Sequence, residues 1–170
     1  MNSETSMRKK KLIISEPVRP TIPGYGISEE KSGLVSWEDV NRWMDESKNY
    51  WINTNRGNFP HSRPVWGIWY EDIFYFGGGS LTQNAKNLVR NNNISVHTES
   101  GENVVIIEGY AEQFSDEDLH QILGELYEKR YKMFHPPPFW RVIPQTIFAW
   151  KISDFANTPT KFICMVNNTE

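Results

Sequence analysis

The stretch from Trp51 to Leu88 constrains the fold most strongly. It reads WINTNRGNFPHSRPVWGIWYEDIFYFGGGSLTQNAKNL, in which β-branched and aromatic residues alternate with turn residues and are followed by a run of glycines. This pattern predicts two or three β-strands that lead into a Gly-rich loop, and the loop opens a helix. We therefore expect a fold built on a sheet whose strands are joined by short turns.

The Gly-rich loop is a candidate anion site. Residues 77–80, Gly-Gly-Gly-Ser, precede Thr82, which is a good helix N-cap residue. Unpaired backbone N–H groups and the positive end of a helix dipole would then face one small volume. Arg63 lies on the preceding strand, from which a guanidinium can donate two hydrogen bonds to a phosphate group. The alternative is a plain hairpin loop with one surface arginine, because short glycine motifs are common.

The composition limits the class of protein. At 170 residues, with 38% hydrophobic and 23% charged residues, the chain is typical of one soluble globular domain. A net charge of −3 gives no basic face for nucleic acid, and no stretch reaches membrane-spanning length. Cys164 is the only cysteine, so an internal disulfide is impossible and a reducing compartment fits. We expect a cytoplasmic protein that binds neither nucleic acid nor membrane.

The elements expected along the chain indicate a mainly β protein with helices. Residues 1–33 are rich in Pro and Gly and predict an extended or disordered lead-in, whereas residues 34–166 form the domain. We expect helices at residues 37–49, 82–90 and 115–131, and strands at residues 50–54, 61–70, 73–76, 94–99, 103–112, 141–151 and 161–166. This pattern fits a small α+β antiparallel barrel, since a doubly wound sheet needs a helix after nearly every strand.

The strand expected at 61–70 indicates a second subunit. Pro60 and Pro64 cannot donate ladder hydrogen bonds, so this strand should lie at an edge or a bulge. Large side chains such as Val65 and Trp66 occupy both of its faces, and aromatic residues make up 14% of the chain. Aromatic residues recur at flat-ligand sites and subunit interfaces, although a small core filled with rings would also use them.

No conventional catalytic set is present in the sequence. The histidines at 61, 97, 120 and 135 have no metal-ligand spacing, so no metal site is predicted. The serines lie in no nucleophile elbow. No residue can therefore be named as catalytic, and in an enzyme of this kind a bound cofactor would supply the chemistry.

Several segments in order resemble one known family. HSRPVWGIW, FYFGGG, TQNAKNL, VHTESGENVVIIEGYAE and PPPFWRVIPQTIFAW, followed by TKF, resemble the pyridoxamine 5′-phosphate oxidase-like, FMN-binding split-barrel family. The resemblance runs from about Val35 to Phe162. It implies a homodimeric, six-stranded antiparallel split β-barrel that holds FMN, or a deazaflavin coenzyme in related branches, in clefts at the subunit interface.

The resemblance also implies which residues bind the cofactor. They come from the second strand, from the segment after the third strand and from one later aromatic residue, and they are Arg63, Pro64, Val65, Trp66, Gly77, Gly78, Thr82, Gln83, Asn84 and Trp140. The second of these segments coincides with the anion site argued from the helix terminus.

Two positions depart from the family pattern. Many members have Ser-Arg-Lys-Ala where this chain has residues 82–85, Thr-Gln-Asn-Ala, so two cations beside the phosphate are missing. Each charge-assisted contact is worth about 1.5–3 kcal/mol. The Arg-x-His substrate motif of true pyridoxamine phosphate oxidases is also absent, because Arg141 has no such His after it. The chain is therefore not expected to oxidise vitamin B6.

The first hypothesis is an FMN-dependent oxidoreductase that moves a hydride or electrons between a donor such as a reduced nicotinamide and a small substrate. A deazaflavin coenzyme is an alternative and would need basic residues near the cleft, for which Lys86, Arg90 and Arg130 are candidates. A non-catalytic protein that binds flavin or haem is another, with His135 as the candidate axial ligand of a haem.

Overall fold

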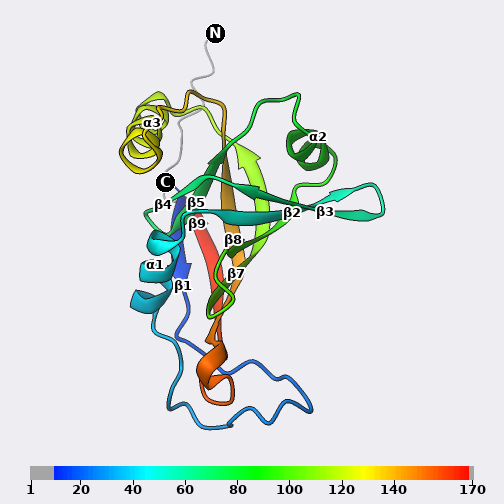
Figure 1. Ribbon diagram of the computed structural model, residues 1–170, viewed down its shortest axis with the longest axis vertical. Helices are drawn as coiled ribbons and strands as arrows, with labels where there is room; N and C mark the ends of the chain where they lie inside the picture. The colour runs from blue at the N-terminus through cyan, green and yellow to red at the C-terminus, as the bar shows by residue number, and fades with distance from the viewer. Residues whose placement is uncertain (1–9, 169–170) are drawn as a thin grey trace.

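The computed structural model describes residues 10–168, which form a mainly β, α+β fold with three α-helices (Figure 1). The helices are α1 (Trp37–Glu46), α2 (Gln83–Arg90) and α3 (Glu117–Tyr131), and the 3-10 turn η1 covers Ile152–Asp154. The strands are β1 (Lys10–Ile14), β2 (Tyr50–Arg56), β3 (Phe59–Val65), β4 (Gly67–Tyr70), β5 (Ile73–Gly77), β6 (Asn93–Thr98), β7 (Asn103–Gln113), β8 (Phe139–Lys151) and β9 (Thr160–Asn168). Among these described helices, none is long and apolar enough to cross a membrane.

One antiparallel sheet contains all the described strands. Its main path runs β1-β9-β8-β7-β6-β2-β3, and β4 and β5 join it through β8. Strand β8 pairs with β7 along one edge, while its other edge pairs first with β5, over residues 139–142, and then with β9, over residues 146–149. The sheet therefore divides at β8 into two branches.

The expected number of six strands is wrong, because the described sheet has nine strands and is open. Residues 10–14 of the predicted lead-in form β1 and pair with β9, because Leu12 and Ile14 pack against the core. The strand expected at 61–70 is interrupted at Trp66, since β3 pairs with β2 whereas β4 pairs with β5. Residues 1–9 of the predicted lead-in lie outside the described residues.

Two clusters of buried apolar side chains form the core. The first lies between the sheet and α1, and the second includes Leu123 and Tyr127 of α3. Strand β5 contributes to both, because Phe74 and Phe76 join the first cluster while Tyr75, which points the other way, joins the second. Most of the aromatic excess in the middle of the chain is therefore used to fill the core.

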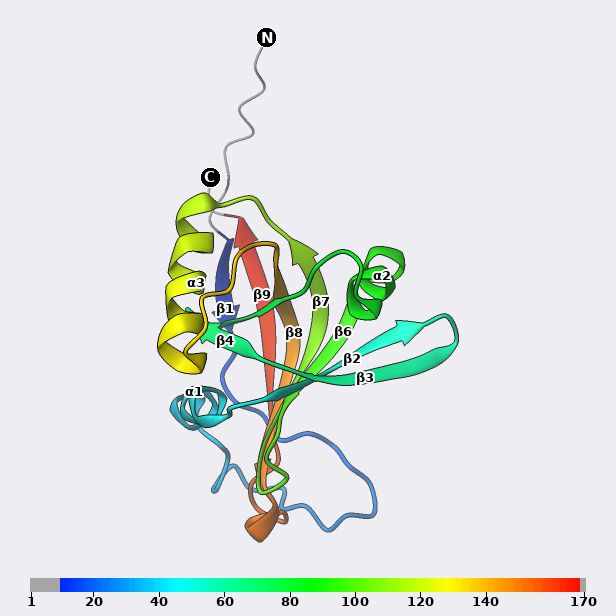
Figure 2. The same cartoon turned by 45° about the horizontal axis from the view of Figure 1, so that its top comes forward.

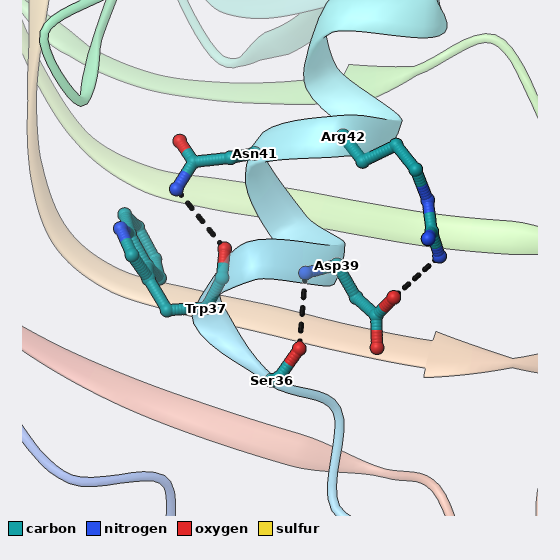
Figure 3. A network of polar contacts seen from close by, with 5 residues as sticks. All are labelled: Ser36, Trp37, Asp39, Asn41 and Arg42. Atoms are coloured by element: carbon teal, nitrogen blue, oxygen red, sulfur yellow. Dashed lines mark hydrogen bonds and ion pairs between the residues drawn. The ribbon is translucent and has the colours of Figure 1, made fainter.

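The start of α1 is fixed by its cap (Figure 3). The Ser36 Oγ accepts a hydrogen bond from the Asp39 N–H (3.0 Å), and Asp39 also pairs with Arg42. The Asn41 Nδ2 donates to the Trp37 carbonyl (3.1 Å). Helix α1 ends at Glu46 rather than at residue 49.

The two sides of the molecule differ. Helices α1 and α3 lie on one side and α2 lies on the other, next to the β2–β3 hairpin, which extends beyond the rest of the sheet (Figures 1 and 2). Strand β3 ends the path of the sheet and pairs only with β2, which confirms the edge position indicated by Pro60 and Pro64. Of the predicted ligand segments, the loop after β5 leads into α2 on this side, whereas Trp66 contacts Tyr131 of α3 on the other side.

Candidate functional site

The loop between β5 and α2 ends in a well-formed helix cap. The Thr82 Oγ1 accepts a hydrogen bond from the Ala85 N–H (3.2 Å) and donates to the Gly79 carbonyl (2.9 Å). Within residues 10–168, the N–H groups of Gln83 and Asn84 donate to no protein acceptor, as is usual in the first turn of a helix. These two free donors lie at the positive end of the α2 dipole.

The glycines of the loop have two different roles. Gly77 pairs with Phe139, and a Cβ there would lie 2.2 Å from the His135 ring, so a larger residue would displace that ring. A Cβ at Gly78 would have no neighbour closer than 3.9 Å, and one at Gly79 would meet nothing within 4 Å. The backbone at Gly78 and Gly79 therefore borders open space, in which an anionic group has room to approach the α2 amides.

Strand β3 presents a cation on the same side. His61, Arg63 and Val65 share one face of the strand, because alternate residues point the same way. Arg63 is exposed, its Nη1 donates to the Ser62 carbonyl (2.8 Å), and it makes no ion pair with any described residue. Val65 packs against the core, whereas Pro64 is exposed. Arg63 is thus available to an external anion.

A polar cluster joins α2 to the β2–β3 hairpin. The Gln83 Nε2 donates to the Asn87 Oδ1 (2.8 Å), and the Asn87 Nδ2 donates to the Thr54 Oγ1 (2.9 Å). Thr54 pairs with His61 across the hairpin, and His61 contacts Asn84. Asn87, Thr54 and His61 are buried, and so is the Asn84 Oδ1, which accepts no hydrogen bond from any described residue. The side chains of Gln83 and Asn84 are therefore directed to the protein.

The surroundings of His61 favour its neutral form over its charged form. Burial lowers its pKa, and the positive charges of Arg63 and Arg56 lower the pKa further, while the contact with Asn84 opposes them. The sequence analysis considered His61 only as a metal ligand and missed the cluster around it. The signal available was the pair of amides at Gln83 and Asn87, which lie one helical turn apart.

Trp66 stands at the break between β3 and β4. Its side chain is 44% exposed and stacks on the Tyr131 ring, with the ring centroids 4.6 Å apart and an angle of 5° between the planes. The stacked pair borders a surface groove of about 520 Å³, whose other walls include Asp45, Glu46 and Arg130. The aromatic rings of this pair would contact a flat small molecule bound in the groove.

Trp140 has a different environment. It is only 5% exposed, pairs with Phe76 and belongs to the first core cluster. Its indole lies 3.9 Å from the position of a Cβ at Gly78. Trp140 therefore supports the loop from the core side.

The structure brings the two predicted segments, residues 63–66 and 77–84, together at two points. His61, which precedes the first segment, contacts Asn84 of the second. The Tyr127 hydroxyl of α3 bonds to the Trp66 carbonyl and to the Gly77 N–H. Within residues 10–168, no group of three His, Cys, Asp or Glu side chains is placed to hold a metal ion.

No protein-family model matches the sequence, and no curated protein matches it. A candidate pyridoxamine 5′-phosphate oxidase from Listeria innocua matches the structure with a TM-score of 0.58 at 18% identity, over 66% of this chain and 95% of that chain. A FAD-binding protein from Mesorhizobium loti matches with a TM-score of 0.56 at 12% identity, over 77% of this chain and 95% of that chain. A candidate 5-nitroimidazole antibiotic resistance protein from Bacteroides thetaiotaomicron matches with a TM-score of 0.58 at 12% identity, over 92% of this chain and 94% of that chain.

These likenesses concern the fold. The structural neighbours include pyridoxamine 5′-phosphate oxidase-like and FAD-binding proteins, so the chain has the mainly β, α+β class of fold that the sequence resemblance implied, with nine strands in an open sheet rather than six. The matched part covers nearly the whole length of each of these neighbours.

Proposed function

We propose that this protein binds a flavin, FMN in the first place, and acts as an oxidoreductase on a small substrate. The observation that carries the proposal is the open backbone of Gly78 and Gly79 beside the free amides of Gln83 and Asn84. Backbone amides at a helix N-terminus are a common phosphate site. The structural neighbour that is described as FAD-binding supports a flavin as the ligand.

The residues present fit the phosphate end of a flavin nucleotide. Thr82 holds the start of α2 in place, the amides of Gln83 and Asn84 donate to the phosphate, and Arg63 adds a charged donor. Residues 64–66 would hold the ring end. A bound flavin supplies the hydride or electron transfer itself. The groove beside Trp66 would admit the small substrate.

Two contacts count against the alternative ligands. Arg130, a candidate for the acidic tail of a deazaflavin coenzyme, already donates to the Asp45 carbonyl (2.6 Å) and to the Ser47 carbonyl. His135, the candidate haem ligand, packs its ring against Gly77, and its Nδ1 lies 2.7 Å from the Pro136 carbonyl oxygen. Arg130 is therefore engaged within the protein, and the packing of the His135 Nε2 against Gly77 would have to give way before that nitrogen could bind a haem.

We also propose that two chains form a homodimer with the flavin sites at their interface. Large apolar side chains remain exposed on the hairpin and around α2, with Phe59 at 77%, Leu81 at 85% and Val89 at 79%. The hairpin extends away from the rest of the sheet, where a second chain can reach it (Figure 2). A second chain that covered these side chains would remove their apolar surface from water. Exposed apolar surface of this kind marks interaction sites.

The test of flavin binding is a fluorescence titration of FMN and of riboflavin with the purified protein. We expect Arg63→Ala to weaken FMN binding by roughly tenfold to a hundredfold, because one charge-assisted phosphate contact is lost. Riboflavin, which has no phosphate, should bind both proteins alike. Arg56→Ala is the matched control, since Arg56 lies on the same hairpin at its far end.

Two results would contradict this proposal. One is a wild-type protein that quenches the fluorescence of neither flavin. The other is an equal loss of FMN affinity in Arg56→Ala and Arg63→Ala, which would mean that the general charge of the hairpin, rather than a contact from Arg63, attracts the phosphate.

A further inference from the structure

Tyr127 connects the two predicted ligand segments through its hydroxyl group. The hydroxyl donates to the Trp66 carbonyl (2.8 Å) and accepts from the Gly77 N–H (3.1 Å). The Tyr127 side chain is on α3 and is only 2% exposed. Tyr127 thus touches both segments at once.

The position of this hydroxyl in the sheet is unusual. Strands β4 and β5 pair in a register that couples Gly67 with Phe76, and Trp66 and Gly77 would be the next pair. The ladder stops there instead. The chain before Gly67 turns to pair with β2, and Gly77 pairs with Phe139 of β8. The hydroxyl therefore stands where the next bond of the β4–β5 ladder would form.

The ring of Tyr127 is held firmly in this position. Its centroid lies 5.1 Å from that of His135, 5.3 Å from that of Tyr131 and 5.7 Å from that of Phe139. Burial raises the pKa of Tyr127 far above its usual value, so the hydroxyl keeps its proton and can donate and accept together. The surrounding rings hold the Tyr127 ring in place. Its hydroxyl therefore keeps the Trp66 carbonyl and the Gly77 N–H at a constant distance from each other.

We propose that Tyr127 is a positioning residue that keeps the end of β3 and the Gly-rich loop apart, so that the flavin site stays open between them. This inference rests on the proposed flavin binding for its functional meaning. Without the hydroxyl, the Trp66 carbonyl and the Gly77 N–H would bond directly, the β4–β5 ladder would gain one pair, and the two ligand segments would close on each other.

Tyr131 provides a matched control on the same helix. Its hydroxyl bonds to the N–H (3.1 Å) and the carbonyl (2.8 Å) of Gly67 and to the Lys48 carbonyl (3.0 Å), and its ring stacks on Trp66. It does not touch Gly77 or the loop. Tyr131→Phe therefore removes a half-buried tyrosine hydroxyl that bonds beside only one of the two segments.

The experiment compares Tyr127→Phe and Tyr131→Phe with the wild type by amide hydrogen exchange and by flavin titration. In Tyr127→Phe we expect the exchange rate of the Gly77 N–H to change about tenfold, and the affinities for FMN and for riboflavin to fall equally, by about tenfold. Tyr131→Phe should leave the Gly77 exchange rate unchanged. The equal loss for both flavins distinguishes this effect from that of Arg63→Ala.

An unchanged exchange rate at Gly77 in Tyr127→Phe, or the same change in both variants, overturns the inference. If the wild type binds no flavin, the proposed function fails, while the exchange rate at Gly77 still decides the role of the hydroxyl. If Tyr127→Phe does not fold, the test is made on the wild type alone. Its Tyr127 hydroxyl proton should give a slowly exchanging NMR signal with a cross-peak to the Gly77 N–H. A rapidly exchanging hydroxyl proton contradicts the inference.

Discussion

Gln83 and Asn84 leave their backbone N–H groups unbonded to any described residue at the start of α2, while the Gln83 side chain bonds to Asn87. Their motif placed both at the start of a helix after a Gly-rich loop, and they occupy the first turn of α2. The inward direction of their side chains was not predictable, because the cluster that they join includes Thr54 and His61 from a hairpin distant in sequence. The first turn of α2 therefore offers backbone donors to a ligand and no cation. The role of these residues in binding stays a prediction.

Replacing Gln83 by Arg should restore one of the missing cations. We expect Gln83→Arg to strengthen FMN binding by at least about tenfold, because a charge-assisted bond to the phosphate is worth about 1.5–3 kcal/mol. Riboflavin affinity should stay the same. Asn91→Arg is the control, since it adds the same charge at the opposite end of α2. Isothermal titration with both flavins checks this prediction, and an equal gain in the two variants contradicts it.

At the level of elements, sequence patterns predicted all three helices, with ends that differ from the structure by a few residues. Helix α1 begins at Trp37, after the Ser36 cap, and α3 begins at Glu117, after the Asp116 cap. The break at Trp66 was missed, although Gly67 follows it, because strand-forming residues continue beyond it, with Val65 before the break and Ile68 and Trp69 after it. Only their pairing with different strands separates β3 from β4, and that pairing is a tertiary property.

The long β7–β8 pair depends on one glycine. The register shifts between Glu108 and Gly109, and a Cβ at Gly109 would lie 2.1 Å from the Ile143 carbonyl oxygen. Because this neighbour is backbone, we expect Gly109→Ala to destabilise the protein by about 1–3 kcal/mol and to lower its Tm. Gly101→Ala, in a turn with nothing within 4 Å of the new Cβ, should change the Tm little. Thermal unfolding followed by circular dichroism compares the two, and equal Tm values would refute the bulge argument.

For the whole molecule, the α+β class followed from the many short strands, but the nine-stranded sheet did not. Strand β1 joins β9 by pairing Ile14 with Cys164, and local patterns carry no information about a contact so distant in sequence. The aromatic excess suggested both a filled core and an interface. The core accounts for side chains such as Phe74 and Phe76, whereas the exposed Phe59 and Trp66 are left for a ligand or a partner.

The most direct measurement of the central claim is size-exclusion chromatography with light scattering and visible absorbance, on protein incubated with FMN. We expect one peak with twice the 19.9 kDa chain mass that carries the absorbance of a bound flavin. Mass analysis of the released ligand then separates FMN from FAD. A peak with the mass of a single chain and no visible absorbance would contradict the account.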